Sequence, residues 1–456
     1  MTEISSGTRR FSSRVGIMLL LLSLAVQYGW TQGLYFPPLA QSAPWDTVSP
    51  GSLGWCTDKI APLYSFLGQE NTKGFLVLKD GKIVLEKYFG TFSKDSLWYW
   101  ASAGKTVTSF LVGCAQEEQR LTITDKSSKY LGAGWTNCTP SQENSITVRN
   151  QLTMTSGLDD DVPDNHCTID TCLIFKADAG SRWAYHNAPY TLLEKVLINA
   201  TGMQINAYTQ QKLMSRTGMS GFWFTIDYDN VFFSSVRSMA RFGLLMQHKG
   251  AWNTDTLMHD TAYLHQMVNT SQQLNLSYGY LWWLNGKSSY MMPTVQYVFP
   301  GSYAPNAPSD MYAGLGKNGQ IVSISLSKGI VMIRMGNPPS SAGSEIPNQF
   351  CDQIWQRLNE VMCNSNAIPG DDRQAPRLQI YPDPAVQNFT IEMPQHSFDI
   401  EMFDLSGRLI LARKSVPGKI KIDVSGIKNG TYLVRVAGEN NFVINRRLVI
   451  LCESRY

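Results

Sequence analysis

The alternation of apolar and polar residues predicts β-strands near both ends of the first 360 residues. Residues 74–88 read as a hairpin, because Phe75–Leu78 and Ile83–Leu85 flank a polar Lys-Asp-Gly-Lys segment. Asp-Gly is a strong two-residue turn signal. Strand character returns at Gln320–Leu326 and Ile330–Met335, which a Ser-Lys-Gly segment joins. We expect the early and late strands to share one antiparallel sheet.

Helical periodicity dominates between these strands and after them. The segment from about Ser102 to Gly286 is helix-rich, and a closing helix is predicted over Ser344–Met362, where large apolar residues recur every three or four positions. This order of elements predicts an α+β fold, with an antiparallel sheet flanked by helices and an all-helical lobe built from the central segment.

The pattern changes again after residue 363. Residues 364–377 are mostly polar and loop-like, which is typical of a linker. Short strands separated by turn signals follow, and their spacing predicts a small C-terminal β-sandwich. The predicted strands are 389–393, 399–403, 420–424, 431–436 and 442–451. We therefore predict a body over 33–363, a linker over 364–377 and a sandwich over 378–456.

The N-terminus has the pattern of a secretory signal peptide, which we assign to residues 1–32. Three arginines precede the apolar run Val15–Val26, and a polar segment follows it. The run is shorter than the roughly 20 residues that a membrane span needs. A retained single anchor is the alternative. No second stretch is long enough to cross a bilayer, so we expect no stable membrane span after signal removal.

Composition narrows the possible partners and ligands. The chain is 43% hydrophobic with a net charge of +3 and no dense Lys/Arg stripe, so a nucleic-acid partner has little electrostatic support.

Export permits disulfides between the cysteines. Cys167 and Cys172 are close enough in the chain to close a small ring, whereas Cys114 falls on the apolar face of a predicted helix as a buried thiol. No cysteine–histidine pattern has zinc spacing, and we expect neither a metal nor another cofactor.

Ser102 and Lys105 form the first candidate for chemistry. Both lie at the start of a segment with helical periodicity, and residues three apart on a helix share a face. A serine hydroxyl needs a neighbouring base, and a lysine amine can serve if burial or nearby positive charge lowers its pKa. A Ser-x-x-Lys pattern arises often by chance, so the alternative is an exposed serine beside a solvated lysine.

Two further patterns give the pair a context. Residues 185–187 read Tyr-His-Asn, and residues 317–319 read Lys-Asn-Gly directly before a predicted strand. With these, the chain resembles the serine β-lactamase and DD-peptidase superfamily, whose signatures SxxK, YxN and KTG occur in this order. The resemblance covers about residues 70–362 and is to the class C and esterase-like branch. Its other supporting segments are 102–109, 151–158, 183–190, 239–245 and 278–283.

The resemblance implies a role for each signature residue. Ser102 would be the acylated nucleophile and Lys105 its base, and Tyr185 would relay protons and activate the deacylating water. Asn187 would orient Lys105 and bind substrate. Lys317 would hold positive potential near Tyr185 or near a substrate carboxylate.

The same resemblance implies an oxyanion hole, formed by the backbone N–H groups of Ser102 and Gln320. Two preorganised donors of this kind contribute several kcal/mol to transition-state stabilisation. The substrate-binding and oxyanion side of the site therefore comprises Asn187, Lys317, Gly319 and Gln320.

Asn318 is a departure from the family pattern. Penicillin-directed members carry Thr or Ser there, so a hydroxyl that would help to hold a β-lactam carboxylate is replaced by an amide. Residues 314–320 look more like the branch that resembles 6-aminohexanoate-dimer hydrolase. We therefore expect an exported hydrolase that cleaves an ester or amide in a small-molecule or peptide-like substrate. The alternatives are a DD-peptidase or β-lactamase, and a non-catalytic penicillin-binding-like receptor or scaffold.

Other candidate sites are less specific. Trp100 stands where the Gly-x-Ser-x-Gly elbow of α/β-hydrolases needs glycine. Asp159–Asp161 could suggest a cation, but the later Gly and Glu of a calcium loop are missing, which favours a solvated loop. His186 lines the pocket, packs in the interior or faces solvent. Trp282 and Trp283 are core or cleft wall rather than ligand-stacking residues, which are the alternative.

Residues 378–450 resemble the C-terminal sorting domain of the Bacteroidota type IX secretion system. The Ile-Tyr-Pro-Asp-Pro-Ala segment at 380–385 looks like its opening strand, although the usual Pro-Asn-Pro reads Pro-Asp-Pro. The resemblance implies the type IX machinery as a partner, and export through the periplasm of a Gram-negative bacterium to the cell surface or the medium. The alternative is a retained β-sandwich that binds carbohydrate or packs on the enzyme.

Overall fold

The computed structural model describes residues 34–340, 346–363, 378–382, 384–404, 407–438 and 443–451. The predicted signal peptide and linker lie outside these ranges. Within the described part of the chain, no helix is long and apolar enough to cross a membrane.

The predicted sheet is present and joins both ends of the body. Among the described residues, six strands pair antiparallel in the order β2-β1-β13-β12-β11-β8, which confirms that early and late strands share one sheet. The strands are β1 (Thr72–Lys79), β2 (Lys82–Tyr88), β8 (Trp283–Leu284), β11 (Tyr312–Gly316), β12 (Gln320–Ser325) and β13 (Ile330–Gly336). The hairpin of β1 and β2 turns at Asp80-Gly81, as the sequence predicts.

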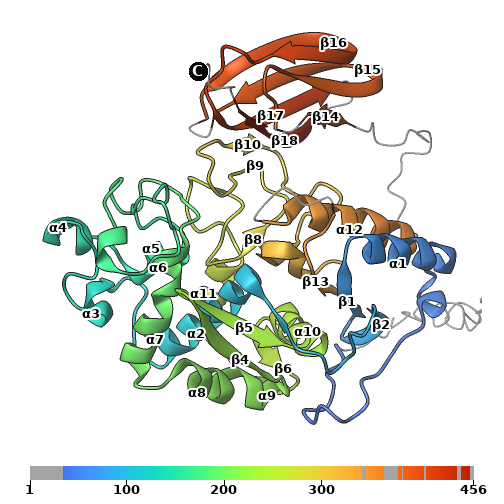
Figure 1. Ribbon diagram of the computed structural model, residues 1–456. Coiled ribbons are helices and arrows are strands. Elements are labelled where there is room, and N and C mark those ends of the chain that lie inside the picture. Colours follow the sequence, from blue (N-terminus) through green and yellow to red (C-terminus); the bar gives the residue numbers. More distant parts are fainter. Residues whose placement is uncertain are drawn as a thin grey trace, which may run out of the picture. The chain divides into compact units, whose positions relative to one another are not determined.

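Helices cover both faces of this sheet (Figure 1). On one face, α10 (Val236–Gln247) approaches so closely that a Cβ at Gly243 would lie 2.4 Å from a methyl group of Val331. On the other face, the indole of Trp355 in α12 (Asn348–Val361) donates to the hydroxyl of Ser323 over 2.9 Å. Every residue of β12 and β13 is buried, which explains why these strands are almost continuously apolar.

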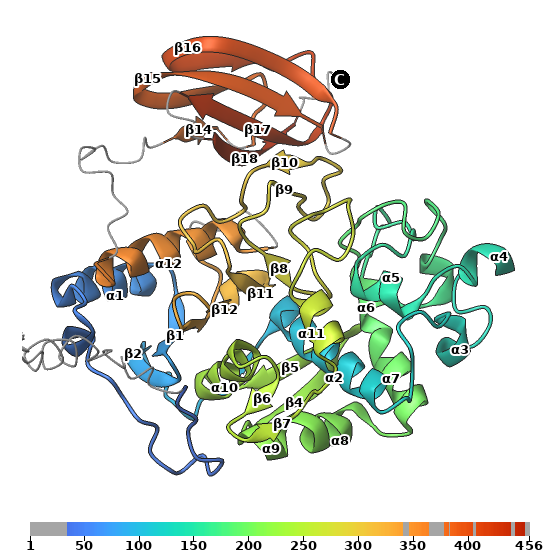
Figure 2. The same cartoon turned by 180° about the vertical axis from the view of Figure 1, so that it is seen from behind.

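The central segment forms the predicted helical lobe at one side of the sheet (Figures 1 and 2). Its helices are α2 (Lys105–Glu117), α3 (Ser128–Leu131), α4 (Pro140–Glu143), α5 (Val148–Leu152), α6 (Asn187–Thr191), α7 (Leu193–Thr201), α8 (Ile205–Thr209), α9 (Ser215–Thr217) and α11 (Thr261–Met267). The short helix α1 (Ile60–Gln69) precedes the first strand and packs beside α12.

A small sheet interrupts the helical lobe, which helical periodicity did not predict. Strand β3 (Trp98–Tyr99) pairs with β5 (Asp229–Ser234), which in turn pairs with β4 (Gly221–Ile226). Two-stranded ribbons of two residues a strand are also present: β6 (Ala251–Trp252) with β7 (Asp255–Thr256), and β9 (Ser289–Tyr290) with β10 (Phe299–Pro300).

The C-terminal domain is an antiparallel β-structure, as predicted. Its described strands are β14 (Gln379–Tyr381), β15 (Asn388–Phe403), β16 (Leu409–Asp423), β17 (Gly430–Gly438) and β18 (Val443–Ile450). The predicted strands 389–393 and 399–403 are two halves of β15, which pairs with β14 near its start and with β17 near its end. Irregular register between these halves allows the sheet to curve around its own apolar core.

Two disulfides join described cysteines. Cys167 and Cys172 close the small ring that the sequence predicts, and Cys114 is a buried free thiol, also as predicted. The second disulfide, between Cys56 and Cys363, ties the segment before α1 to the end of α12 across a separation of 307 residues. No local pattern in the sequence indicates that pair.

Candidate active site

Ser102 lies in a short turn that connects the small sheet to helix α2. Residues Ala101–Gly104 form a 3-10 turn, and α2 begins at Lys105 rather than at Ser102 as the periodicity suggests. Ala101 has φ 46°, a left-handed backbone conformation that is strained for a residue with a side chain. Such strain persists only where the surroundings enforce it. The turn therefore holds Ser102 in a fixed, half-buried position.

Glycines in β11 allow the sheet to enforce this turn. A Cβ at Gly316 would lie 2.3 Å from the carbonyl oxygen of Trp100 and 3.1 Å from the backbone nitrogen of Ser102. A Cβ at Gly314 would lie 3.2 Å from the carbonyl oxygen of Ala103. The Gly-Leu-Gly pattern thus permits backbone-to-backbone packing that any larger residue would prevent.

The amine of Lys105 lies next to the hydroxyl of Ser102. Its Nζ atom is 3.1 Å from Oγ of Ser102 and donates to Oδ1 of Asn187 over 2.9 Å. The Tyr190 ring centroid is 3.9 Å from the same amine, and the Tyr185 ring centroid 5.3 Å. Lys105 is only 4% exposed. Burying an ammonium costs several kcal/mol, and the amide oxygen and aromatic faces offset part of that cost.

Tyr185 belongs to an aromatic wall beside the amine. Its ring stacks on Trp283 with 6.0 Å between centroids and also packs against Trp183 and Tyr278. Trp283 is therefore part of the wall of the site, whereas Trp282 stacks on Phe242 in the core. Both tryptophans thus have the core or cleft-wall role that the sequence favours over ligand stacking.

His186 packs in the interior and does not join the polar cluster. It is 2% exposed, and no described residue hydrogen-bonds to either ring nitrogen. Burial lowers the pKa of His186 to about 4, so the ring is neutral at pH 7. Of the roles that the sequence allowed, which were pocket lining, packing and a solvent-facing position, packing is the one observed.

The side-chain amide of Asn187 is positioned by residues that lie outside the three sequence signatures. Its Nδ2 atom donates to Oδ1 of Asn165 over 3.1 Å and lies 3.2 Å from Nε2 of His166. Nδ1 of His166 lies 2.8 Å from Oδ1 of Asp229 in β5. Because the Asn187 amide donates, Nε2 of His166 accepts and its Nδ1 donates to the carboxylate. A hydrogen-bonded chain therefore runs from Asp229 through His166 and Asn187 to Lys105.

The loop that carries His166 is fastened at several points. The Cys167–Cys172 ring directly follows it, and the backbone of Ala188 donates to the carbonyl oxygen of Asn165 over 2.9 Å. Two of the three consecutive aspartates have cationic partners: Asp159 pairs with Lys176 and Asp160 with Arg182. In the described ranges, no group of three His, Cys, Asp or Glu side chains could hold a metal ion.

The third signature forms a tight turn between β11 and β12. Asn318 has φ 65° and ψ 21°, in the left-handed region, and its Nδ2 atom donates to the hydroxyl of Tyr99 over 2.7 Å. Lys317 is exposed, and Gly319 and Gln320 are buried. The side chain of Gln320 bonds both backbone groups of Gly336 in β13, which fixes the start of β12.

Arg334 braces this turn from inside the fold. Its guanidinium is fully buried and donates to the carbonyl oxygens of Asn318, Gly319, Glu70 and Asn337 and to the hydroxyl of Thr72. Burial lowers the pKa of Arg334 to about 9, which still leaves the group charged at pH 7. A Cβ at Gly319 would lie 2.6 Å from the guanidinium, so this contact requires glycine.

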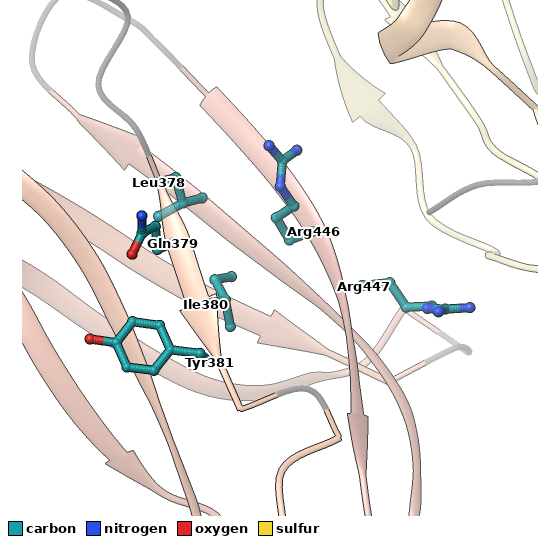
Figure 3. Close-up of a pocket in the computed structure, with 6 residues that line it drawn as sticks. All are labelled: Leu378, Gln379, Ile380, Tyr381, Arg446 and Arg447. Carbon is teal, nitrogen blue, oxygen red and sulfur yellow. The ribbon is translucent and has the colours of Figure 1, made fainter. Parts of the chain in front are cut away.

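The C-terminal domain has a separate shallow depression, shown in Figure 3. Its volume is about 450 Å³, and it is lined by Leu378, Gln379, Ile380, Tyr381, Arg446 and Arg447. No serine, cysteine or paired base is among these residues. The groups that the sequence assigns to catalysis all come from the body.

Comparison with known proteins places the body in a family. The family model described as Beta-lactamase matches residues 69–348, more than half of the chain. The chain belongs to the beta-lactamase family. Within this family member, the three signatures lie on a 3-10 turn and helix start, on the start of α6 and on the β11–β12 turn.

Solved structures share the fold of this beta-lactamase family member at low sequence identity. A Bacillus anthracis protein assigned as a 6-aminohexanoate-dimer hydrolase matches with a TM-score of 0.54 and 16% identity, covering 74% of this chain and 90% of that one. A protein from Bacteroides dorei assigned as a beta-lactamase has a TM-score of 0.53 and 16% identity, with coverages of 68% and 99%. A penicillin-binding protein homologue from Caulobacter crescentus has a TM-score of 0.52 and 14% identity, with coverages of 68% and 99%.

The C-terminal domain matches a second model, the Secretion system C-terminal sorting domain, over residues 379–451. This domain directs export through type IX secretion to the cell surface or the extracellular space, and it implies contact with the secretion machinery. Among curated proteins, an ulvan lyase from Nonlabens ulvanivorans is 28% identical over 88 residues. That match spans 19% of this chain and 16% of the lyase.

Proposed function

We propose that this protein is an exported serine hydrolase that cleaves an ester or amide bond through an acyl-enzyme on Ser102. The observation that carries the proposal is the contact of Lys105 Nζ with Ser102 Oγ at 3.1 Å, in a family of hydrolases and penicillin-binding relatives. A hydroxyl and an amine at this distance satisfy the geometric requirement for nucleophile and general base.

Acylation uses the buried amine as the base. The Ser102 oxygen attacks the substrate carbonyl carbon while its proton passes to Lys105, which must be unprotonated at that moment. The resulting oxyanion faces the backbone N–H groups of Ser102 and Gln320, which we assign as the oxyanion hole. Collapse of the tetrahedral species breaks the bond to the leaving alcohol or amine, and Tyr185 passes a proton to that group.

Deacylation repeats the step with water. Tyr185 accepts a proton from the attacking water, and the new oxyanion uses the same two donors. Cleavage of the bond between the acyl carbon and the Ser102 oxygen then releases a carboxylic acid. Lys105 returns the proton that it took during acylation to the Ser102 oxygen. Lys317 supplies positive potential at the mouth of the site, and Gly319 lets the turn before Gln320 pack on Arg334.

The preference for esters or amides over β-lactams rests on Asn318. Its amide is directed to the Tyr99 hydroxyl at 2.7 Å, and its left-handed backbone disfavours the Thr of the penicillin-directed members. The retained Ser102–Lys105–Asn187 cluster argues against a non-catalytic receptor, which would have no need of a buried lysine beside a serine.

A fluorophosphonate probe tests the proposal directly. We expect the wild type to be labelled and Ser102→Ala not to be, whereas Ser215→Ala, at an exposed serine of α9, serves as the matched control and labels normally. The wild type should hydrolyse p-nitrophenyl acetate and leave nitrocefin intact. Equal labelling of Ser102→Ala would remove Ser102 from the mechanism. Nitrocefin turnover would favour the β-lactamase alternative.

A further inference from the structure

The three-stranded sheet β3-β5-β4 is fixed directly beneath the nucleophile turn. On its buried face, Trp223 is 4% exposed and Phe232 is fully buried. A Cβ at Gly104, in the Ser102 turn, would lie 3.4 Å from Cβ of Phe232 and 3.7 Å from the Trp223 ring. The position of this sheet relative to Ser102 is therefore set by close packing.

The opposite face of the same sheet is apolar and open to solvent. The strand register pairs Tyr99 with Phe233 and Phe233 with Phe222, and it pairs Phe224 with Val231. Paired residues of an antiparallel sheet share a face. With Ile226, these side chains form a surface that we call the aromatic face: Tyr99, Phe222, Phe224, Ile226, Val231 and Phe233.

The aromatic face exposes large apolar side chains. Phe222 is 41% exposed, Phe224 57% and Ile226 44%. The rings of Phe222 and Phe233 are stacked at 5.5 Å with an interplanar angle of 6°, so these two rings lie parallel to each other. Contiguous exposed apolar patches mark binding surfaces more often than scattered single residues do.

One end of the aromatic face contacts the third signature, and the other end reaches the second signature through His166. At one end, the Tyr99 hydroxyl accepts from Asn318 in the third signature at 2.7 Å. At the other end, Asp229, the register partner of Ile226, contacts His166, which in turn contacts Asn187. Of the described side chains that the register places on this face, Asp229 alone is charged, and His166 pairs with it.

We propose that the aromatic face binds an extended apolar group, alkyl or aryl, of the ester or amide that Ser102 attacks. This inference rests on the proposed function and adds a substrate class to it. Its contacts through Asn318 and His166 join this face to the third and second signatures, and the lack of unpaired charge on it favours an apolar occupant over a polar one. Aromatic rings contribute both buried area and stacking to its binding.

A chain-length series tests the inference. For the full chain, kcat/KM should rise about tenfold or more from p-nitrophenyl acetate to p-nitrophenyl octanoate. Phe224→Ser and Phe222→Ser should keep the acetate value and lose most of that rise. Leu326→Ser is the matched control: it removes a 41% exposed apolar residue just after the end of β12 that lies away from Gln320, and its profile should equal that of the wild type.

A second measurement does not depend on catalysis. In the Ser102→Ala protein, Nile red should bind, octanoate should displace it, and Phe224→Ser should weaken its binding. Thermal melting should confirm that each variant is folded. Because Phe224 is solvent-exposed, we expect the melting temperature of the Phe224→Ser protein to equal that of the wild type.

The outcomes separate the inference from the function on which it rests. Ser102-dependent hydrolysis of acetate with no preference for octanoate overturns the aromatic-face inference and leaves the serine mechanism standing. Acetate hydrolysis that persists in Ser102→Ala overturns the acyl-enzyme mechanism. Nile red binding, and its loss in Phe224→Ser, still tests the aromatic face in that case. A wild-type dimer that Phe224→Ser converts to a monomer would show that a second copy covers the face, and would overturn the inference.

Discussion

The Nζ atom of Lys105 lies 2.9 Å from Oδ1 of Asn187, although the two residues are 82 positions apart in the chain. This contact joins the start of α2 to the start of α6, and it fixes the amine beside Ser102. The orientation of the amine is therefore a property of two helices held together. It does not follow from the Ser-x-x-Lys spacing alone.

Asn187→Ala should lower kcat/KM for p-nitrophenyl acetate by about 10²-fold or more, because misplacing a general base forfeits much of the 10²–10⁴-fold that such a base contributes. Lys105→Ala should lower it at least as much. Burst-phase kinetics should show that acylation is the step that these substitutions slow. Asn144→Ala, at an exposed asparagine just after α4 and outside the cluster, is the comparison variant. A near-normal acylation rate in Lys105→Ala would mean that another base acts.

His166 should act as a positioning residue through Asn187. His166→Leu removes the acceptor at 3.2 Å from the Asn187 amide, so we expect kcat to fall about tenfold while KM for the acetate ester stays within about twofold. His166→Gln offers an amide oxygen as an acceptor and should restore most of the activity. If kcat and KM changed together, or if Gln gave no rescue, His166 would have only a structural role.

Buried His186 should make the protein less stable in mild acid. Its folded-state pKa of about 4 lies below the ordinary 6.5, so between these values the unfolded chain binds a proton that the folded chain does not. Stability should therefore fall as pH drops from about 6.5 to about 4, by on the order of 3 kcal/mol, and this contribution should level off below that.

The variant His186→Leu isolates that contribution. Urea unfolding at pH 7 and at pH 4.5 measures the loss of stability in each protein, and the loss should be smaller in His186→Leu than in the wild type. His248→Leu, which replaces a half-buried histidine bonded to the carbonyl oxygen of Ala251, is the comparison. Identical acid sensitivity of wild type and His186→Leu would contradict the prediction.

Asn318→Thr should not convert the protein into a β-lactamase. The left-handed backbone at position 318, with φ 65°, penalises a β-branched residue by about 1–2 kcal/mol. We expect chemical denaturation to show a loss of stability of that order and nitrocefin to remain intact. Asn318→Gly tolerates this conformation and should lose only the bond to Tyr99. Unchanged stability together with new nitrocefin turnover would refute this account of the third signature.

The pairing of the cysteines predicts how many free thiols the processed protein contains. Of eight cysteines, Cys452 leaves if the C-terminal domain is removed after export, and seven remain. Four form the two disulfides, and Cys114, Cys138 and Cys351 are free. Alkylation of the unfolded, unreduced protein should therefore add three labels by intact mass. An even number of labels would contradict this pairing.

The fold agrees with what local sequence patterns predicted most directly. The Asp80-Gly81 turn, the apolar strands at 320–326 and 330–335, and the closing helix depend on local periodicity, and all are present. Strands β4 and β5 were not predicted because both faces of β4 carry apolar residues. Period-two alternation cannot appear where the exposed face is itself aromatic.

The order of the signatures along the chain was enough to indicate the family and the fold class, and the strand pattern after residue 378 was enough to indicate the sorting domain. The groups that surround the signatures become visible only when the chain is folded. Asn165, His166 and Asp229 meet behind Asn187, and Cys56 meets Cys363, because a packed lobe and sheet bring distant segments together. Such contacts leave no periodic trace in the chain, since each depends on the register and packing of elements far apart in sequence.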